Sequence, residues 1–110
     1  MSMTVGELFE ALATRFDSAA AAGFHKTLQW HIKDEDPGVW AFEMNHGVGR
    51  LIPGGVDNPD TTFTTTAATW MAIAEGRQDA MKAFMTGKLK VSGDMMLAMK
   101  VPHLFKTQPA

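Results

Sequence analysis

The chain contains no cysteine among its 110 residues. This absence excludes disulfides, thiolate zinc sites, iron–sulfur clusters and cysteine nucleophiles. The chain also lacks an apolar run of the roughly 20 residues needed to span a bilayer, and it does not start with a basic segment followed by an apolar core. With 45% hydrophobic and 20% charged residues, the composition is that of one soluble globular domain over residues 1–110, and we expect it in the cytoplasm.

Positive charge is scarce in most of the chain and gathers near its end. Residues 1–76 carry four Lys or Arg against ten Asp or Glu, whereas residues 77–110 carry six against two. The net charge of −2 argues against a nucleic-acid partner. The basic C-terminal part is compatible with an ordinary solvated face, or with a docking surface for anionic membranes or ligand headgroups.

Motifs that would indicate an enzyme are missing. Gly47-x-Gly49 has Ile52 where a dinucleotide fingerprint needs its third glycine. Ser92 lacks the flanking glycine pair of a nucleophile elbow. The four histidines form no metal-binding pair at helical spacing. We therefore expect no catalytic residues, no metal site and no cofactor.

Hydrophobic periodicity predicts an α+β fold. Thr4 and Glu7 form a capping box before a helix that we expect to continue to Ala22. Residues with a period of two predict five strands, and those with a helical period predict three more helices, the last beginning at Asp94 and ending at Pro102. The predicted strands are 26–33, 39–45, 48–52, 61–66 and 88–92, and the two middle helices are 67–75 and 78–86. This order predicts a five-stranded, mostly antiparallel sheet with the helices packed on one face.

Methionine is concentrated near the basic region, because six of the nine methionines fall between residues 71 and 99. Methionine is flexible and polarizable, so it fills irregular gaps in a core and also lines surfaces that accept several shapes. By composition, this region is either core packing or the wall of a cavity for an apolar ligand.

The segment Gly87-Lys88-Leu89-Lys90-Val91-Ser92-Gly93-Asp94, preceded by Phe84 and followed by Leu97-Ala98-Met99-Lys100, resembles the C-terminal signature of the sterol carrier protein type 2 family of nonspecific lipid-transfer proteins. The first hairpin, the Gly-x-Gly hairpin that ends in Pro53, and the helix closed by Gly76 support this resemblance. It covers the chain from about Gly23 to Phe105.

The resemblance implies a sheet with helices on one side that enclose an apolar tunnel for fatty acyl chains, sterol-like molecules or isoprenoids. Residues that match the family pattern and are implied near this tunnel are Phe84, Leu89, Val91, Met95, Leu97, Ala98 and Met99. Periodicity and composition add Trp70, Ile73, Met81, Met85 and Met96. We expect Lys88, Lys90 and Lys100 to contact a lipid headgroup or a membrane surface.

Two functions follow from this interpretation. The first is noncatalytic binding or carriage of lipids. The alternative is an accessory domain that presents a hydrophobic patch to a lipid-metabolising enzyme, or to a second copy of itself in a homodimer.

Overall fold

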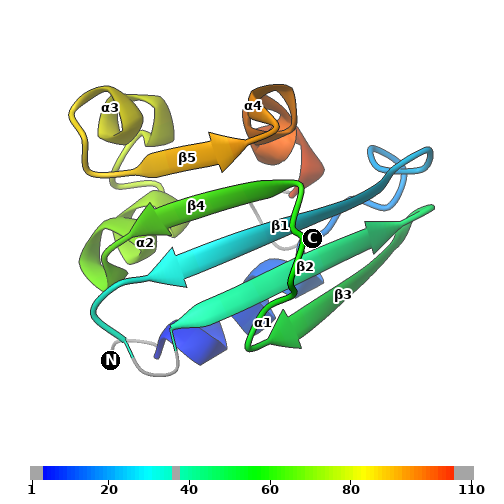
Figure 1. The fold of residues 1–110 in the computed structure, drawn as a ribbon, viewed down its shortest axis with the longest axis horizontal. Helices are drawn as coiled ribbons and strands as arrows, with labels where there is room; N and C mark the ends of the chain where they lie inside the picture. The colour runs from blue at the N-terminus through cyan, green and yellow to red at the C-terminus, as the bar shows by residue number, and fades with distance from the viewer. Residues whose placement is uncertain (1–3, 36–37, 106–110) are drawn as a thin grey trace.

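The computed structural model describes residues 4–35 and 38–105. Four helices and five strands follow one another along this part of the chain (Figure 1). In order, they are α1 (Val5–Thr14), β1 (His25–Ile32), β2 (Val39–Asn45), β3 (Val48–Pro53), β4 (Thr61–Thr65), α2 (Ala67–Ala74), α3 (Ala80–Met85), β5 (Lys90–Gly93) and α4 (Met95–Leu104).

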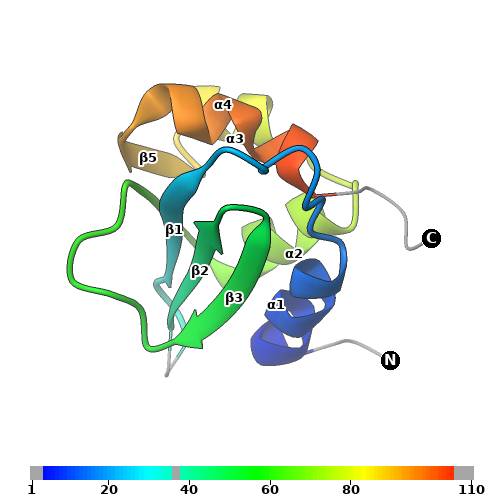
Figure 2. The ribbon, with the colours of Figure 1, turned by 90° about the vertical axis from the view of Figure 1, so that its right-hand side faces the viewer.

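The five strands form one sheet in the order β3-β2-β1-β4-β5. The sheet is mixed, and the prediction of a mostly antiparallel sheet was wrong, because β4 runs parallel to β1 at the centre. The reason is the connection after β3: residues 54–60 cross the face opposite the helices and bring β4 to the far side of β1 (Figures 1 and 2). Gln29 fixes this crossing, since its Oε1 accepts a hydrogen bond of 2.7 Å from the backbone N–H of Val56.

The first helix begins as predicted but ends early. The hydroxyl of Thr4 accepts from the Glu7 N–H at 3.0 Å and the Glu7 carboxylate accepts from the Thr4 N–H at 2.8 Å, which completes the capping box. The helix then stops at Thr14 and does not reach Ala22. The cause is a tertiary contact, because the Asp17 N–H donates to the carbonyl of Leu104 at 2.8 Å and draws the chain away from the helix axis.

Pro102 does not end the last helix, contrary to the sequence prediction, and α4 continues to Leu104. A proline inside a helix removes one backbone bond and costs about 3 kcal/mol. Shortly after Pro102, the side chains of Leu104 and Phe105 are both buried. Burial of two such side chains contributes about 1.5–3 kcal/mol each, which outweighs the cost of the proline.

Helices α1 and α2 cover one face of the sheet (Figure 2), and aromatic side chains join them to it. The Phe9 ring lies between the indoles of Trp40 and Trp70, with centroid distances of 5.3 and 5.5 Å, and 5.3 Å from that of Trp30. The other two helices, α3 and α4, lie beside the edge strand β5, and α4 contributes Leu97 to the core. Side chains fill this interior, and the enclosed tunnel that the resemblance implies is not seen among the described residues.

Candidate functional site

An open pocket of about 290 Å³ lies between the start of β1 and the first turns of α4. Its lining combines apolar side chains with two lysines and one carboxylate: Phe24, Lys26, Asp94, Met96, Leu97 and Lys100. We call this the α4 pocket.

Asp94 holds one side of the α4 pocket in place. Its Oδ1 accepts from the Leu97 N–H at 3.0 Å and so caps α4. Its Oδ2 lies 3.8 Å from the Lys26 Nζ. Its backbone is also anchored, because its carbonyl accepts from the Thr61 hydroxyl at 2.7 Å and its N–H donates to the Asp60 carbonyl at 2.8 Å. The first turn of α4 is therefore fixed to β1 and β4.

The conformation of Gly93 permits this anchoring. It has a φ of +91°, and a Cβ at this position would overlap the carbonyl oxygen of Asp60. Only glycine combines this backbone conformation with such a close approach. The Ser-Gly-Asp turn in the sequence therefore has a structural cause, which is the docking of α4 on the chain before β4.

The two lysines lie at the rim of the α4 pocket, whereas Leu97 is buried at its base. The Lys100 Nζ lies 5.0 Å from the centroid of the Phe24 ring, within cation–π range. An apolar base below cationic groups suits a molecule with a hydrocarbon part and an anionic or polar end.

The α4 pocket brings together three of the predicted site residues, namely Met96, Leu97 and Lys100. Of the others, Trp70 and Leu89 are buried, and Ile73, Val91 and Ala98 are half-buried on the helix-covered side of the sheet. The remaining apolar candidates are exposed on α3 and α4 and line no enclosed space in this structure: Met81, Phe84, Met85, Met95 and Met99. Lys88 and Lys90 are exposed on the segment between these two helices.

Sequence reasoning missed Phe24 and Lys26 as pocket residues and treated Asp94 only as a helix cap. Phe24 and Lys26 stand about seventy residues before α4 in the chain. They reach it because β1 pairs with β4 and β4 pairs with β5. No local pattern in the sequence reports those two pairings.

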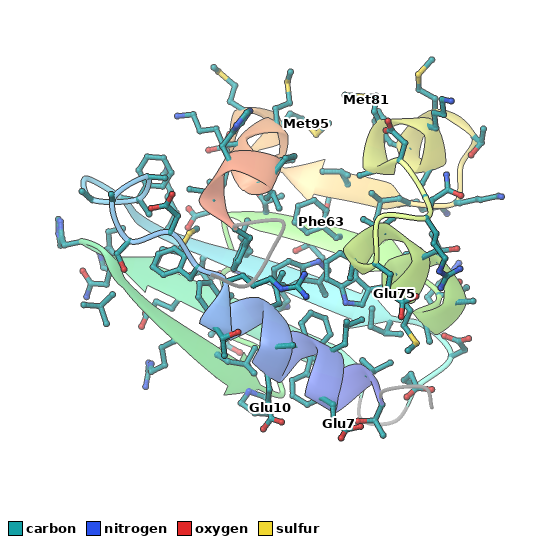
Figure 3. All side chains as sticks on the ribbon, turned by 180° about the vertical axis from the view of Figure 1, so that it is seen from behind. Glu7, Glu10, Phe63, Glu75, Met81 and Met95 are labelled. Carbon is teal, nitrogen blue, oxygen red and sulfur yellow. The ribbon has the colours of Figure 1, made fainter. Side chains whose placement is uncertain are left out.

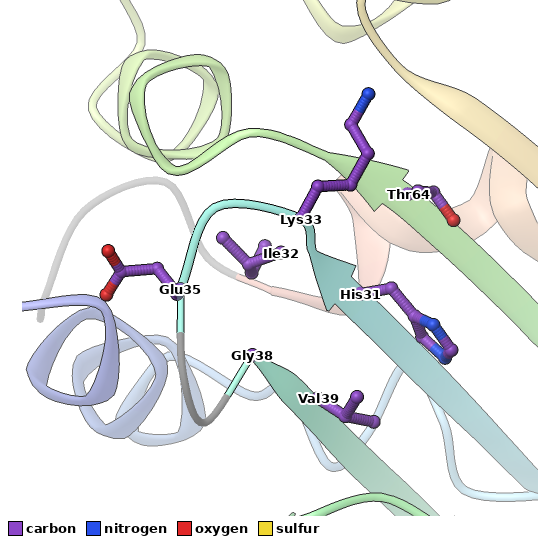
Figure 4. Close-up of a pocket in the computed structure, with 7 residues that line it drawn as sticks. All are labelled: His31, Ile32, Lys33, Glu35, Gly38, Val39 and Thr64. Atoms are coloured by element: carbon purple, nitrogen blue, oxygen red, sulfur yellow. The ribbon is translucent and has the colours of Figure 1, made fainter.

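A second open depression, of about 340 Å³, lies at the end of β1 (Figure 4). Its lining includes the polar or charged residues His31, Lys33, Glu35 and Thr64. The rest of this hairpin tip, residues 36–37, lies outside the described residues. This depression is less suited than the α4 pocket to an apolar ligand.

Two indole N–H groups are buried in the core, those of Trp40 and Trp70, and neither has a hydrogen-bond acceptor among the described residues. A buried donor without an acceptor costs about 1–3 kcal/mol. The interior between α1, α2 and the sheet therefore has two points at which an oxygen atom would be stabilised.

Within residues 4–35 and 38–105, no three His, Asp or Glu side chains lie close enough together to hold a metal ion. None of the helices in these ranges has the length and apolar character needed to cross a bilayer.

A model of the SCP-2 sterol transfer family matches residues 7–106. Human sterol carrier protein 2 is 33% identical over 66 residues, which are 60% of this chain and 12% of the human protein. The chain therefore spans only a small part of the curated relatives that it matches.

Two solved structures share the fold. The inverting sec-alkylsulfatase Pisa1 from Pseudomonas sp. superposes with a TM-score of 0.81 and 27% identity, over 98% of this chain and 17% of the enzyme. The palmitated SCP2L2 from Aedes aegypti superposes with a TM-score of 0.67 and 24% identity, over 94% of this chain and 99% of that protein.

Proposed function

The chain belongs to the SCP-2 sterol transfer family, a family of lipid-binding domains, and we propose that it binds and carries lipids with a long hydrocarbon chain without catalysing a reaction on them. The observation that carries this proposal is the α4 pocket, in which the apolar side chains of Leu97 and Met96 line the same space as Lys26 and Lys100.

Fatty acids are the ligand class that this arrangement fits best. Each methylene removed from water contributes about 0.8 kcal/mol, so a 16-carbon chain offers on the order of 10 kcal/mol before the costs of binding. The carboxylate at its end would lie next to Lys26 and Lys100. A carboxylate beside the Lys100 ammonium group at this exposed rim adds a smaller contribution, of about 1 kcal/mol, and Lys26 adds less because it already pairs with Asp94.

The α4 pocket is small for a lipid site, since its 290 Å³ is just below the range of about 300–1,000 Å³ that ligand sites usually have. We infer that the acyl chain of the ligand continues inward past Leu97, toward the core cluster that Leu97 joins. The side chains of Leu97, which is buried at the base, and of Met96, which is largely exposed, would change rotamers to open this path.

Uptake of a fluorescent fatty acid, followed by competition with palmitate, tests the proposal. Palmitate is a suitable probe because the solved Aedes relative is a palmitated protein. We expect saturable uptake at one site per chain and displacement by palmitate. Native mass spectrometry of the purified protein should also show masses of bound acyl species. A ligand-free mass together with no uptake would contradict the proposed function.

A further inference from the structure

We propose that the exposed surface of α3 and α4 docks on anionic lipid bilayers. The residues of this surface, which we call the α3–α4 surface, are Met81, Lys82, Phe84, Met85, Lys88, Lys90, Met95, Met96, Met99 and Lys100. This partner is distinct from the single lipid in the proposed function, because attachment to a bilayer and uptake of one acyl chain are separate events.

The first observation is the amount of apolar surface that remains open to solvent. Met85 is 77% exposed, Met96 is 72% exposed and Met99 is 66% exposed, and three further apolar residues of the same two helices are at least 39% exposed. Single exposed apolar residues are ordinary, but six on two helices that lie on the same side of β5 indicate an interaction surface (Figure 1). Figure 3 shows Met81 and Met95 directed away from the core, which is marked there by Phe63.

The second observation is the charge of the same surface. Lys82, Lys88, Lys90 and Lys100 are exposed there, and none of the four forms a salt bridge within the described part of the chain. The nearby carboxylates are engaged at backbone N–H groups or with other cations. Asp79 and Asp94 cap α3 and α4, and Glu75 pairs with Arg77. This combination complements an anionic bilayer. The apolar side chains enter the acyl region, and the anionic headgroups attract the ammonium groups.

The acidic part of the molecule orients this attachment. Residues 1–76 have six more acidic than basic side chains. Glu7 and Glu10 on α1 lie at the opposite end of the molecule from Met81 and Met95 (Figure 3). An anionic bilayer repels that end and attracts the α3–α4 surface. Since Met96 and Lys100 belong both to this surface and to the α4 pocket, the docked orientation points the pocket toward the bilayer.

The same charges argue against a second copy of the chain as the occupant. A two-fold dimer through the α3–α4 surface would place the same lysine-rich patch of both copies face to face. Like charges in such a contact destabilise it. A bilayer with anionic headgroups carries the complementary charge.

Co-sedimentation with lipid vesicles tests the proposal. The full chain is mixed with vesicles of phosphatidylcholine alone, or with about 30 mol% phosphatidylserine, at low and high salt. We expect binding to the anionic vesicles only, weakened by salt. Each lysine near an anionic surface contributes about fivefold to affinity, so Lys88→Gln/Lys90→Gln should weaken binding about 25-fold. Met85→Gln/Met99→Gln should weaken it by roughly tenfold or more.

Matched controls on the rest of the surface separate docking from nonspecific attraction. Val48→Gln removes an apolar side chain of similar exposure (68%) from β3, and Lys33→Gln removes an exposed lysine from the end of β1. Both should bind vesicles as the wild type does. Circular dichroism checks that every variant is folded. Equal binding of the α3–α4 variants and the wild type would overturn the proposal, as would equal binding to neutral and anionic vesicles.

Two further outcomes are decisive. A stable dimer in light scattering that fails to bind vesicles would overturn the proposal in favour of a homodimer interface. Fatty-acid uptake by the wild type without any vesicle binding would overturn docking and leave the proposed function intact. Vesicle binding without uptake would contradict only the proposed function.

Discussion

The Lys100 ammonium group lies 5.0 Å from the centroid of the Phe24 ring, so a residue of the last helix and the residue before the first strand face each other across the α4 pocket. A second pair crosses the same pocket, between Lys26 and Asp94 at 3.8 Å. Each pair joins the start of the central strand β1 to the last helix, α4. The pocket therefore exists only in the complete fold.

The lysines at the rim should distinguish charged from neutral lipids. We predict that Lys100→Gln weakens palmitate binding about fivefold, because it removes an interaction of about 1 kcal/mol with the carboxylate. The same substitution should leave the affinity for hexadecanol, which has no charge, close to that of the wild type. Competition against a fluorescent fatty acid measures both affinities, and Lys33→Gln serves as the control. An equal loss for both lipids would show that Lys100 does not contact the headgroup.

A larger side chain at Met96 should close the pocket. Met96 lines the α4 pocket and is largely exposed, so Met96→Trp fills space without disturbing the core, and we predict at least a roughly tenfold loss of fatty-acid affinity. Val48→Trp is the matched control, since Val48 has similar exposure but lies on the edge strand β3. Wild-type affinity in Met96→Trp would show that lipid enters elsewhere.

The close approach at Gly93 should be costly to disturb. Gly93 and Gly54 have nearly the same positive φ, of +91° and +90°, but only Gly93 faces a backbone carbonyl where its Cβ would lie. We expect Gly54→Ala to lower the free energy of unfolding by about 1–2 kcal/mol, the cost of this backbone conformation. Gly93→Ala should cost about 1–3 kcal/mol more because of the overlap with Asp60. Urea unfolding measures both, and similar values would contradict the role of this contact.

The capping box at α1 should give a small dependence of stability on pH. The backbone N–H of Thr4 donates to the Glu7 carboxylate, and this bond, with a contribution from the Thr4 hydroxyl, lowers the pKa of Glu7. A lowered pKa in the folded state means that the stabilisation is complete above the ordinary glutamate pKa of about 4.3, and is lost as the pH falls through the lowered value.

A non-titrating variant isolates this effect. Glu7→Gln keeps an acceptor oxygen for Thr4 but cannot ionise. The wild type should be the more stable protein at neutral pH, because a carboxylate interacts favourably with the N-terminus of a helix. We expect this difference in urea midpoint to disappear under acid conditions. A difference that is the same at both pH values would contradict the assignment to Glu7.

The sequence predicted most elements of the fold because their patterns are local. The alternation from Val39 to Asn45 and the caps at Thr4 and Asp94 depend on neighbours within a few residues, and the structure confirms each of them. The parallel pairing of β1 with β4 could not be predicted in this way. It depends on which side of the sheet the chain takes after Pro53, and no periodicity records that choice.

The methionine-rich helices show a second limit. The apolar spacing of α3 and α4 suggested a wall that faces inward. In α3, however, only Ala83 is buried, and Met81 and Met85 face solvent. When both sides of a short helix carry apolar residues, periodicity cannot tell which side meets the core. The residue of α3 that joins the core cluster is the small one, Ala83.

The most direct test of lipid binding in the α4 pocket is crosslinking with a photoactivatable analogue of palmitate, followed by peptide mass spectrometry. Illumination of the saturated protein should attach one analogue per chain, at peptides that contain Phe24 or the segment from Met96 to Lys100, and excess palmitate should prevent the reaction. Labelling at other peptides, or labelling that palmitate does not reduce, would contradict this location for the lipid.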